Sequence, residues 1–255
     1  MNELRIPLDP LNPGHFFACC GLLDLLGCGT PTVRAHFTCD EATPRRAHFI
    51  VTSAERIDLA GLLDSVRGGS YEVLPHDQKA IQPVAANLNG HRLVMDWWLD
   101  TFQEDTTPLK CWAGQVTTGK LFADLPPLID VAADPDALFY SPALTRSKFG
   151  IDPRSAWNAL DFGFSPDKHN RDSATYPIVE MLGAIGLQGF RPRPDTRDRR
   201  SLEYRLWSVP LHLSVARLAA FSGWPGLPSF RYRFSIAKRG QSYKFYTFAK
   251  FEERT

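Results

Sequence analysis

The sequence predicts an α+β fold in which antiparallel sheets pack against helices. Strand and helix signals in its first third follow the order β-α-β-β-α, which is typical of a layered α+β domain. Aromatic-rich strand candidates return near the C-terminus.

The first strand and the first helix follow from local signals. Residues 4–9, LRIPLD, alternate well enough for a strand. Asn12 is a suitable N-cap, and Pro13 suits the first helical position because its missing N–H would be unpaired there. The helix runs to about Leu26, where GCG ends it. Its leucines leave little polar face, so we expect it to be buried.

The next elements are predicted to be a hairpin and a second helix. Residues 33–38 and 46–52 read as its two strands. The TSAE sequence at 52–55 matches a capping box and predicts the start of a helix with one apolar stripe. Two glycines at 68 and 69 predict its end.

The middle of the chain is less regular. Residues 91–100 form a strand candidate and residues 111–125 favour a helix. Asp152 is the expected cap of a further short helix. Residues 176–190 predict a helix whose two internal glycines are expected to mark close packing rather than a hinge.

The C-terminal quarter is predicted to hold a basic loop at 191–200, a strand within 202–211, and a final hairpin that turns at KRGQS. We therefore divide the chain into an α+β core with a helical middle, 1–190, and a basic loop with a hairpin region, 191–255. We expect the two to pack as one domain.

The composition is that of an ordinary globular protein, with 44% hydrophobic and 22% charged residues among 255. The longest apolar run is too short to span a membrane. The five cysteines include no CxxC pair, so reduced thiols are expected. These features favour a cytoplasmic protein with no membrane partner.

The net charge of +1 conceals an asymmetry between the two parts of the chain. Residues 191–255 carry 14 Lys and Arg against 5 Asp and Glu, a net charge of +9, which leaves −8 for residues 1–190. Either the basic end faces a polyanion, or the two parts pair with each other.

Catalytic and cofactor motifs give little support to an enzyme. The GQVTTGKL sequence at 114–121 resembles a phosphate-binding loop, but Leu121 stands where a Mg²⁺ ligand belongs. No histidine spacing fits a metal site, GxSxG is absent, and no cofactor is expected. His36 and His48 occupy like positions on the predicted hairpin, where they could act as general base and acid on RNA.

Basic and aromatic residues at the C-terminus form the candidate nucleic-acid interface. On a strand over 229–237, side chains alternate, so the aromatic residues share one face and the arginines the other. Cationic side chains can bind phosphates, and a tyrosine can stack on a base. The expected interface comprises Arg191, Arg193, Arg197, Arg199, Arg200, Arg231, Arg233, Lys238, Arg239, Tyr243, Lys244 and Tyr246.

Several stretches together resemble one known family. They include IPLDPLNPGHFFACCGLLDLL, DWWLD followed by KCWAGQ, KFGIDPRSAWNALDFGFSPD, YPIVEMLGAIGLQGFRP and IAKRGQSYKFYTFAKFEE. In this order they are similar to the small Csb-type ("Csb three") proteins of type I-U CRISPR systems, also called type I-G. The resemblance spans most of the chain. It implies a bacterial cytoplasmic protein that works beside an RNA-guided antiviral complex, built either on ferredoxin-like domains or as a reduced large subunit.

From the resemblance and the basic end we expect a nucleic-acid-binding, non-catalytic subunit of the effector complex. Its partners would be CRISPR RNA, target DNA or both, together with other Cas subunits. One alternative is a metal-independent endoribonuclease that uses His36 or His48 on CRISPR RNA precursors. A second alternative is a structural subunit whose basic end docks on an acidic protein.

Overall fold

The structure is a computed structural model. It describes residues 2–28, 30–39, 45–100, 105–113, 115–132, 134–156, 172–192, 198, 200–222, 224, 226–239 and 243–254.

The first third has the predicted order of elements. It consists of β1 (Asn2–Leu8), α1 (Pro13–Gly27), β2 (Arg34–Cys39), β3 (Ala47–Ser53) and α2 (Leu59–Gly68). The strands form an antiparallel sheet in the order β1-β3-β2, so α1 crosses over β3 to connect the two outer strands. This is a split β-α-β unit. A ferredoxin-like sheet would gain another strand after α2, but β4 (Ser70–Val73) pairs with β5 (Val84–Leu88) instead.

Two helix starts differ from the prediction. The TSAE sequence does not cap α2, because Thr52 and Ser53 still pair with β1. The cap is Asp58, whose carboxylate accepts a hydrogen bond from the Gly61 amide at 3.0 Å. Of the predicted helix over 111–125, the described residues form only α3 (Thr118–Asp124), capped by Thr117. At TSAE, pairing with β1 outweighs the local capping pattern.

The middle of the chain contains short elements. The strand candidate at 91–100 divides into β6 (His91–Met95), which extends the β4-β5 sheet, and β7 (Leu99–Asp100), which pairs with β8 (Asp105–Thr106). Asp152 caps a short helix as expected, but η4 (Pro153–Ser155) is a 3-10 helix, and most of the segment after it lies outside the described residues. The remaining short elements are η1 (Lys79–Ile81), η2 (Pro126–Leu128), η3 (Pro135–Ala137), β9 (Ala143–Thr145) and β10 (Ser173–Thr175).

A long strand organises the C-terminal sheet. This strand, β12 (Ser229–Arg239), pairs with β11 (Ser201–Trp207) along one edge. Its other edge pairs with β14 (Lys250–Arg254) near its start and with β13 (Tyr243–Tyr246) near its end. The predicted hairpin is therefore β12-β13, and a third strand adds to it. The short helix α6 (Leu213–Ala219) connects β11 to β12.

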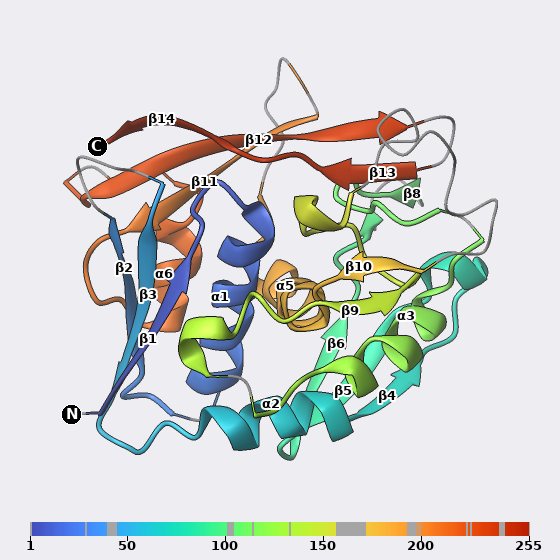
Figure 1. Cartoon of the computed structure of the whole chain (residues 1–255), viewed down its shortest axis with the longest axis horizontal. Coiled ribbons are helices and arrows are strands. Elements are labelled where there is room, and N and C mark those ends of the chain that lie inside the picture. The colour runs from blue at the N-terminus through green and yellow to red at the C-terminus, as the bar shows by residue number, and fades with distance from the viewer. Residues whose placement is uncertain are drawn as a thin grey trace.

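Two buried helices form the centre of the molecule. In Figure 1, α1 and α5 (Pro177–Gly189) lie between the β1-β3-β2 sheet, the C-terminal sheet and the β4-β5-β6 sheet. A Cβ atom on Gly21 would lie 1.9 Å from the Leu182 carbonyl oxygen, and one on Gly186 would lie 2.1 Å from that of Phe17. The glycines thus mark close helix packing, as expected. One continuous core runs from Leu4 to Ala249 and includes residues from both parts of the chain.

Within the described ranges, no helix has both the length and the apolar character that crossing a bilayer would require. The five cysteines are free thiols.

Candidate nucleic-acid interface

Strand β12 divides the predicted basic residues between two faces of the C-terminal sheet. The inward face carries Phe230, Tyr232, Phe234 and Ile236, all buried in the core as the alternation predicts. Arg231 and Arg233 lie on the outward face. Lys238 follows Ile236 by two residues and therefore lies on the same side of the strand. Because it lies past the end of the core, its side chain is exposed. The surroundings of Lys238 therefore differ from those of Arg231 and Arg233.

The outward arginines are paired with glutamates from neighbouring strands. Glu203 on β11 accepts hydrogen bonds from Arg233, at 2.6 Å from its Nη2, and from Arg231. On β14, Glu253 lies 3.1 Å from Arg231 Nε and Glu252 lies 3.8 Å from Arg233 Nε. Such cross-strand pairs stabilise the sheet. Carboxylates already occupy the guanidinium groups of these two arginines, and their place in a phosphate-binding surface stays a prediction.

Arg191 is likewise engaged within the fold. Its Nη2 lies 2.6 Å from Asp96 Oδ1, and Gln188 donates to the same carboxylate at 3.0 Å. Arg217 of α6 pairs with Asp24 of α1 at 2.7 Å in the same way. Both ion pairs join the basic C-terminal part to the acidic N-terminal part, so part of the charge asymmetry is compensated internally.

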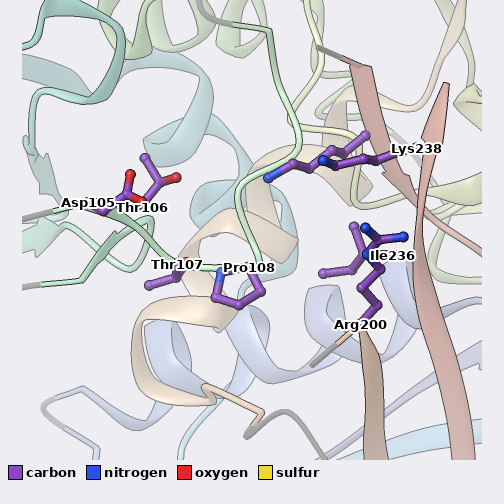
Figure 2. A pocket seen from close by; sticks show the side chains of 8 residues that line it. Asp105, Thr106, Thr107, Pro108, Arg200, Ile236 and Lys238 are labelled. Carbon is purple, nitrogen blue, oxygen red and sulfur yellow. The ribbon is translucent and has the colours of Figure 1, made fainter. Parts of the chain in front are cut away.

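Three predicted cations meet in one pocket at the far end of β12. The pocket has a volume of about 280 Å³ and is lined by Asp105, Thr106, Thr107, Pro108, Arg200, Ile236, Lys238 and Lys244. Figure 2 shows Arg200, Ile236 and Lys238 on one side of it. No described carboxylate forms an ion pair with Arg200, Lys238 or Lys244. This pocket thus gathers cations that the described part of the fold leaves without an anionic partner.

The register of β12 and β13 forces two of these cations together. Lys238 and Lys244 are direct cross-strand partners. The Lys244 amide donates away from β12, to the Cys111 carbonyl at 3.2 Å, so the two lysines form a non-hydrogen-bonded pair. In such pairs the side chains are closest, with about 4.5 Å between Cα atoms. Like charges in directly opposed positions destabilise a sheet.

A further lysine adds to the positive charge near this pocket. Lys110 Nζ donates to the Trp112 carbonyl at 2.7 Å and lies 4.9 Å from the Trp112 ring centroid. Burial, followed by the nearby Lys244 ammonium, lowers the pKa of Lys110. Nothing local in the sequence links this segment to the C-terminal hairpin, so the pattern alone did not predict Lys110, Asp105, Thr106 and Pro108 as part of the site.

The remaining predicted interface residues fall into two groups. Tyr246 does not stack on a base in this fold: its ring is completely buried, and its hydroxyl lies 3.1 Å from the Leu109 carbonyl oxygen. This expectation is corrected, because Tyr246 pairs with Ile236 on the inward face. Outside the described side chains lie Arg193, Arg197, Arg199, Arg239 and Tyr243, of which only the last two have a described backbone.

The two candidate catalytic histidines share a sheet face without being opposed. His36 pairs with Ile50 and His48 with Thr38, so the histidines are diagonal neighbours. Arg5 Nη2 lies 3.2 Å from His48 Nδ1, which therefore acts as the acceptor. Burial lowers the pKa of both histidines, and Arg5 lowers that of His48 further. The lone pair that a general base would use at His48 Nδ1 is thus occupied.

A carboxyl group with a raised pKa lies in the centre of the protein. Glu180 is completely buried and accepts hydrogen bonds from the backbone amides of Phe149 at 2.7 Å, Gly150 at 3.0 Å and Asp152 at 3.2 Å. Burial, followed by the charge of Asp152, raises the pKa of Glu180 to about 7. Because it binds the backbone of one loop and is shielded from solvent, this group holds the loop in place. No cluster of three metal-ligating side chains occurs among the residues that are described.

Comparison with known proteins finds no matching family model, no matching curated protein and no matching solved structure.

Proposed function

We propose that this protein binds nucleic acid through the pocket at the end of β12, as a non-catalytic subunit of a type I-U (I-G) CRISPR effector complex. The binding role rests on one observation: Arg200, Lys238 and Lys244 converge without a described carboxylate partner. The placement in an effector complex rests on the family resemblance of the sequence. CRISPR RNA or target DNA would be the ligand, and other Cas subunits the neighbours.

Phosphate is the natural partner for such a group of cations. Two opposed ammonium groups repel each other in the free protein, and an anion between them removes that repulsion. A phosphodiester also releases condensed counterions when lysine or arginine neutralises it, so binding depends steeply on salt. The paired arginines on the outward face lack this advantage, because a phosphate would have to displace a glutamate.

A salt titration of binding tests this function. The purified protein is mixed with labelled CRISPR RNA, single-stranded DNA or duplex DNA, and the products are run on a denaturing gel. We expect salt-sensitive binding without cleavage. For single strands, the logarithm of affinity should fall with the logarithm of salt with a slope of about −0.7 for each phosphate neutralised.

The matched variants are Lys244→Gln in the pocket and Arg233→Gln on the outward face. Loss of Lys244 should weaken binding and flatten the salt slope, whereas loss of Arg233 should change both much less. Equal effects of the two variants would contradict the assignment of the pocket. Cleaved RNA would instead support the endoribonuclease alternative and make His36 and His48 the next positions to change.

A further inference from the structure

The pocket at the end of β12 has two chemically different ends. Figure 2 shows Asp105 and Thr106 on the side opposite Arg200, Ile236 and Lys238, with Pro108 between them. Asp105 belongs to β8 and is exposed, and no described cation pairs with it. One end therefore offers cations to an anion, and the other offers a carboxylate and a hydroxyl to hydrogen-bond donors.

An apolar surface connects the two ends. The Pro108 ring lies between them, and Ile236 lines the wall on the cationic side. A ligand that fits this sequence of surfaces carries negative charge at one end, a flat or apolar body, and N–H or O–H donors at the other end. A nucleotide has this order of groups: a phosphate, a sugar and base with apolar faces, and donors on the base edge or the ribose.

Size and charge both oppose a duplex in this site. The volume of about 280 Å³ is near the lower end of small-ligand pockets, which span roughly 300–1,000 Å³. In a duplex the base donors are paired in the interior, and the outside is a continuous line of phosphates that Asp105 would repel. In a single strand an unstacked base can turn out and present its edge to protein.

We infer that the pocket holds one unpaired nucleotide of a single strand, with its phosphate at Arg200, Lys238 and Lys244, its ring or sugar against Pro108, and a donor directed at Asp105. This inference rests on the proposed function and specifies its ligand. The donor is a base amino group or the ribose 2′-hydroxyl, both of which a carboxylate accepts.

Fluorescence anisotropy with short labelled oligonucleotides tests the inference in the full-length protein. The ligands are oligocytidine and oligouridine as RNA, oligodeoxycytidine as DNA, and a DNA duplex, all of equal length. Oligocytidine carries the amino group that oligouridine lacks, and the RNA–DNA comparison isolates the 2′-hydroxyl. We expect single strands that carry the recognised donor to bind about tenfold more tightly than the duplex, a difference of about 1.4 kcal/mol.

Two variants examine the two ends separately. The double variant Lys238→Gln/Lys244→Gln should weaken binding of every single strand and reduce the salt slope by about 0.7, because one phosphate loses its neutralising ammonium groups. Asp105→Ala, which removes the acceptor, should leave that slope unchanged and remove most of the preference for the donor-bearing strand. Arg233→Gln, which alters a paired arginine of the same strand, is the control.

The outcomes separate the inference from the proposed function. A duplex that binds as tightly as the single strands, with the same loss in the double variant, would overturn the inference and leave the proposed function standing. An unchanged strand preference in Asp105→Ala would also overturn it. Absence of salt-sensitive binding to any nucleic acid would reject the proposed function itself.

Discussion

A lysine and an arginine on one strand of this protein have opposite electrostatic surroundings. Lys238 is opposed by Lys244, whereas Arg233 is opposed by Glu203. The first pair costs stability and leaves charge available for a ligand. The second contributes stability and uses its charge within the sheet. At this scale, the neighbour across the strand decides whether a basic residue can bind a phosphate.

This difference predicts stability changes of opposite sign. Without nucleic acid and at low salt, Lys238→Gln should raise the free energy of unfolding by about 0.5 kcal/mol, because a like-charge pair is removed. Arg233→Gln should lower it by about 1 kcal/mol, because an ion pair of a half-exposed group is lost. Urea unfolding of both variants beside the unaltered protein gives the comparison. Changes of the same sign would contradict the electrostatic account.

The buried carboxyl group of Glu180 predicts a pH dependence of stability. Burial raises the pKa of Glu180 in the folded state to about 7, above the ordinary value of 4.5. Between these values the folded protein binds more protons than the unfolded chain, so this group's contribution to stability falls as pH rises. His15 acts in the opposite direction, because burial lowers its pKa.

We therefore use the difference between the unaltered protein and Glu180→Gln, in which the histidine contributions cancel. The free energy of unfolding of the unaltered protein minus that of the variant should fall by about 2 kcal/mol between pH 5 and pH 8. Urea unfolding at the two pH values measures it. A difference that is constant with pH would mean that Glu180 does not titrate in this range.

At the scale of elements, the contact between α1 and α5 is the one that added side-chain volume would disrupt most. Both helices are buried along most of their length, and both begin with proline. Their backbones approach so closely at Gly21 and Gly186 that a single methyl group would meet a carbonyl oxygen of the other helix. Three sheets lie around this pair in Figure 1, so the separation of the two helices affects the positions of their strands.

Gly21→Ala should consequently lower the free energy of unfolding by about 3 kcal/mol, at the upper end of overpacking effects. The control is Gly68→Ala at the end of α2, where an added Cβ meets nothing within 4 Å. That change should be neutral or stabilise by about 0.5 kcal/mol, since it restricts the unfolded chain. Thermal unfolding of both variants tests this. A tolerated Gly21→Ala would show that the helices can move apart.

For the whole molecule, the acidic and basic parts share one core. Tyr204 of β11 stacks on Phe16 of α1 with ring centroids 4.4 Å apart, and Phe234 of β12 meets Phe17 at 6.1 Å. The ion pairs Arg191–Asp96 and Arg217–Asp24 cross the same boundary. Strands β11 and β12 therefore cover the inner helices rather than forming an appendage.

A chain that ends at residue 190 should therefore fail to fold cooperatively. It would expose the aromatic side of α1 that β11 and β12 cover, an apolar area too large to leave in water. The full chain should melt in one transition, and so should a chain that ends at residue 249, because β14 is an exposed edge strand. Circular dichroism on heating distinguishes the three. A cooperative transition in the 190-residue chain would show two independent domains.

Local patterns were sufficient to predict part of the fold. The caps at Asn12 and Asp152, the hairpin of β2 and β3, and the alternation of β12 all depend on residues a few positions apart. The helix start predicted at TSAE was wrong, because a capping signal and a strand end have similar sequences, and only the partner strand distinguishes them. The prediction that Tyr246 stacks on a base was wrong for a related reason: only its register with Ile236 places it on the inward face.

The sequence by itself determined the α+β class, the order of the first elements and the burial of the first helix, since apolar periodicity and caps act over short distances. Only the tertiary structure decided which basic residues are available to a ligand. Glu203, Glu252 and Glu253 reach their arginines across strands, and β8 and Pro108 meet Lys238 and Lys244 from a distant part of the chain. Coulomb interactions depend on distance in space, and no spacing along the chain reveals which charges will be neighbours.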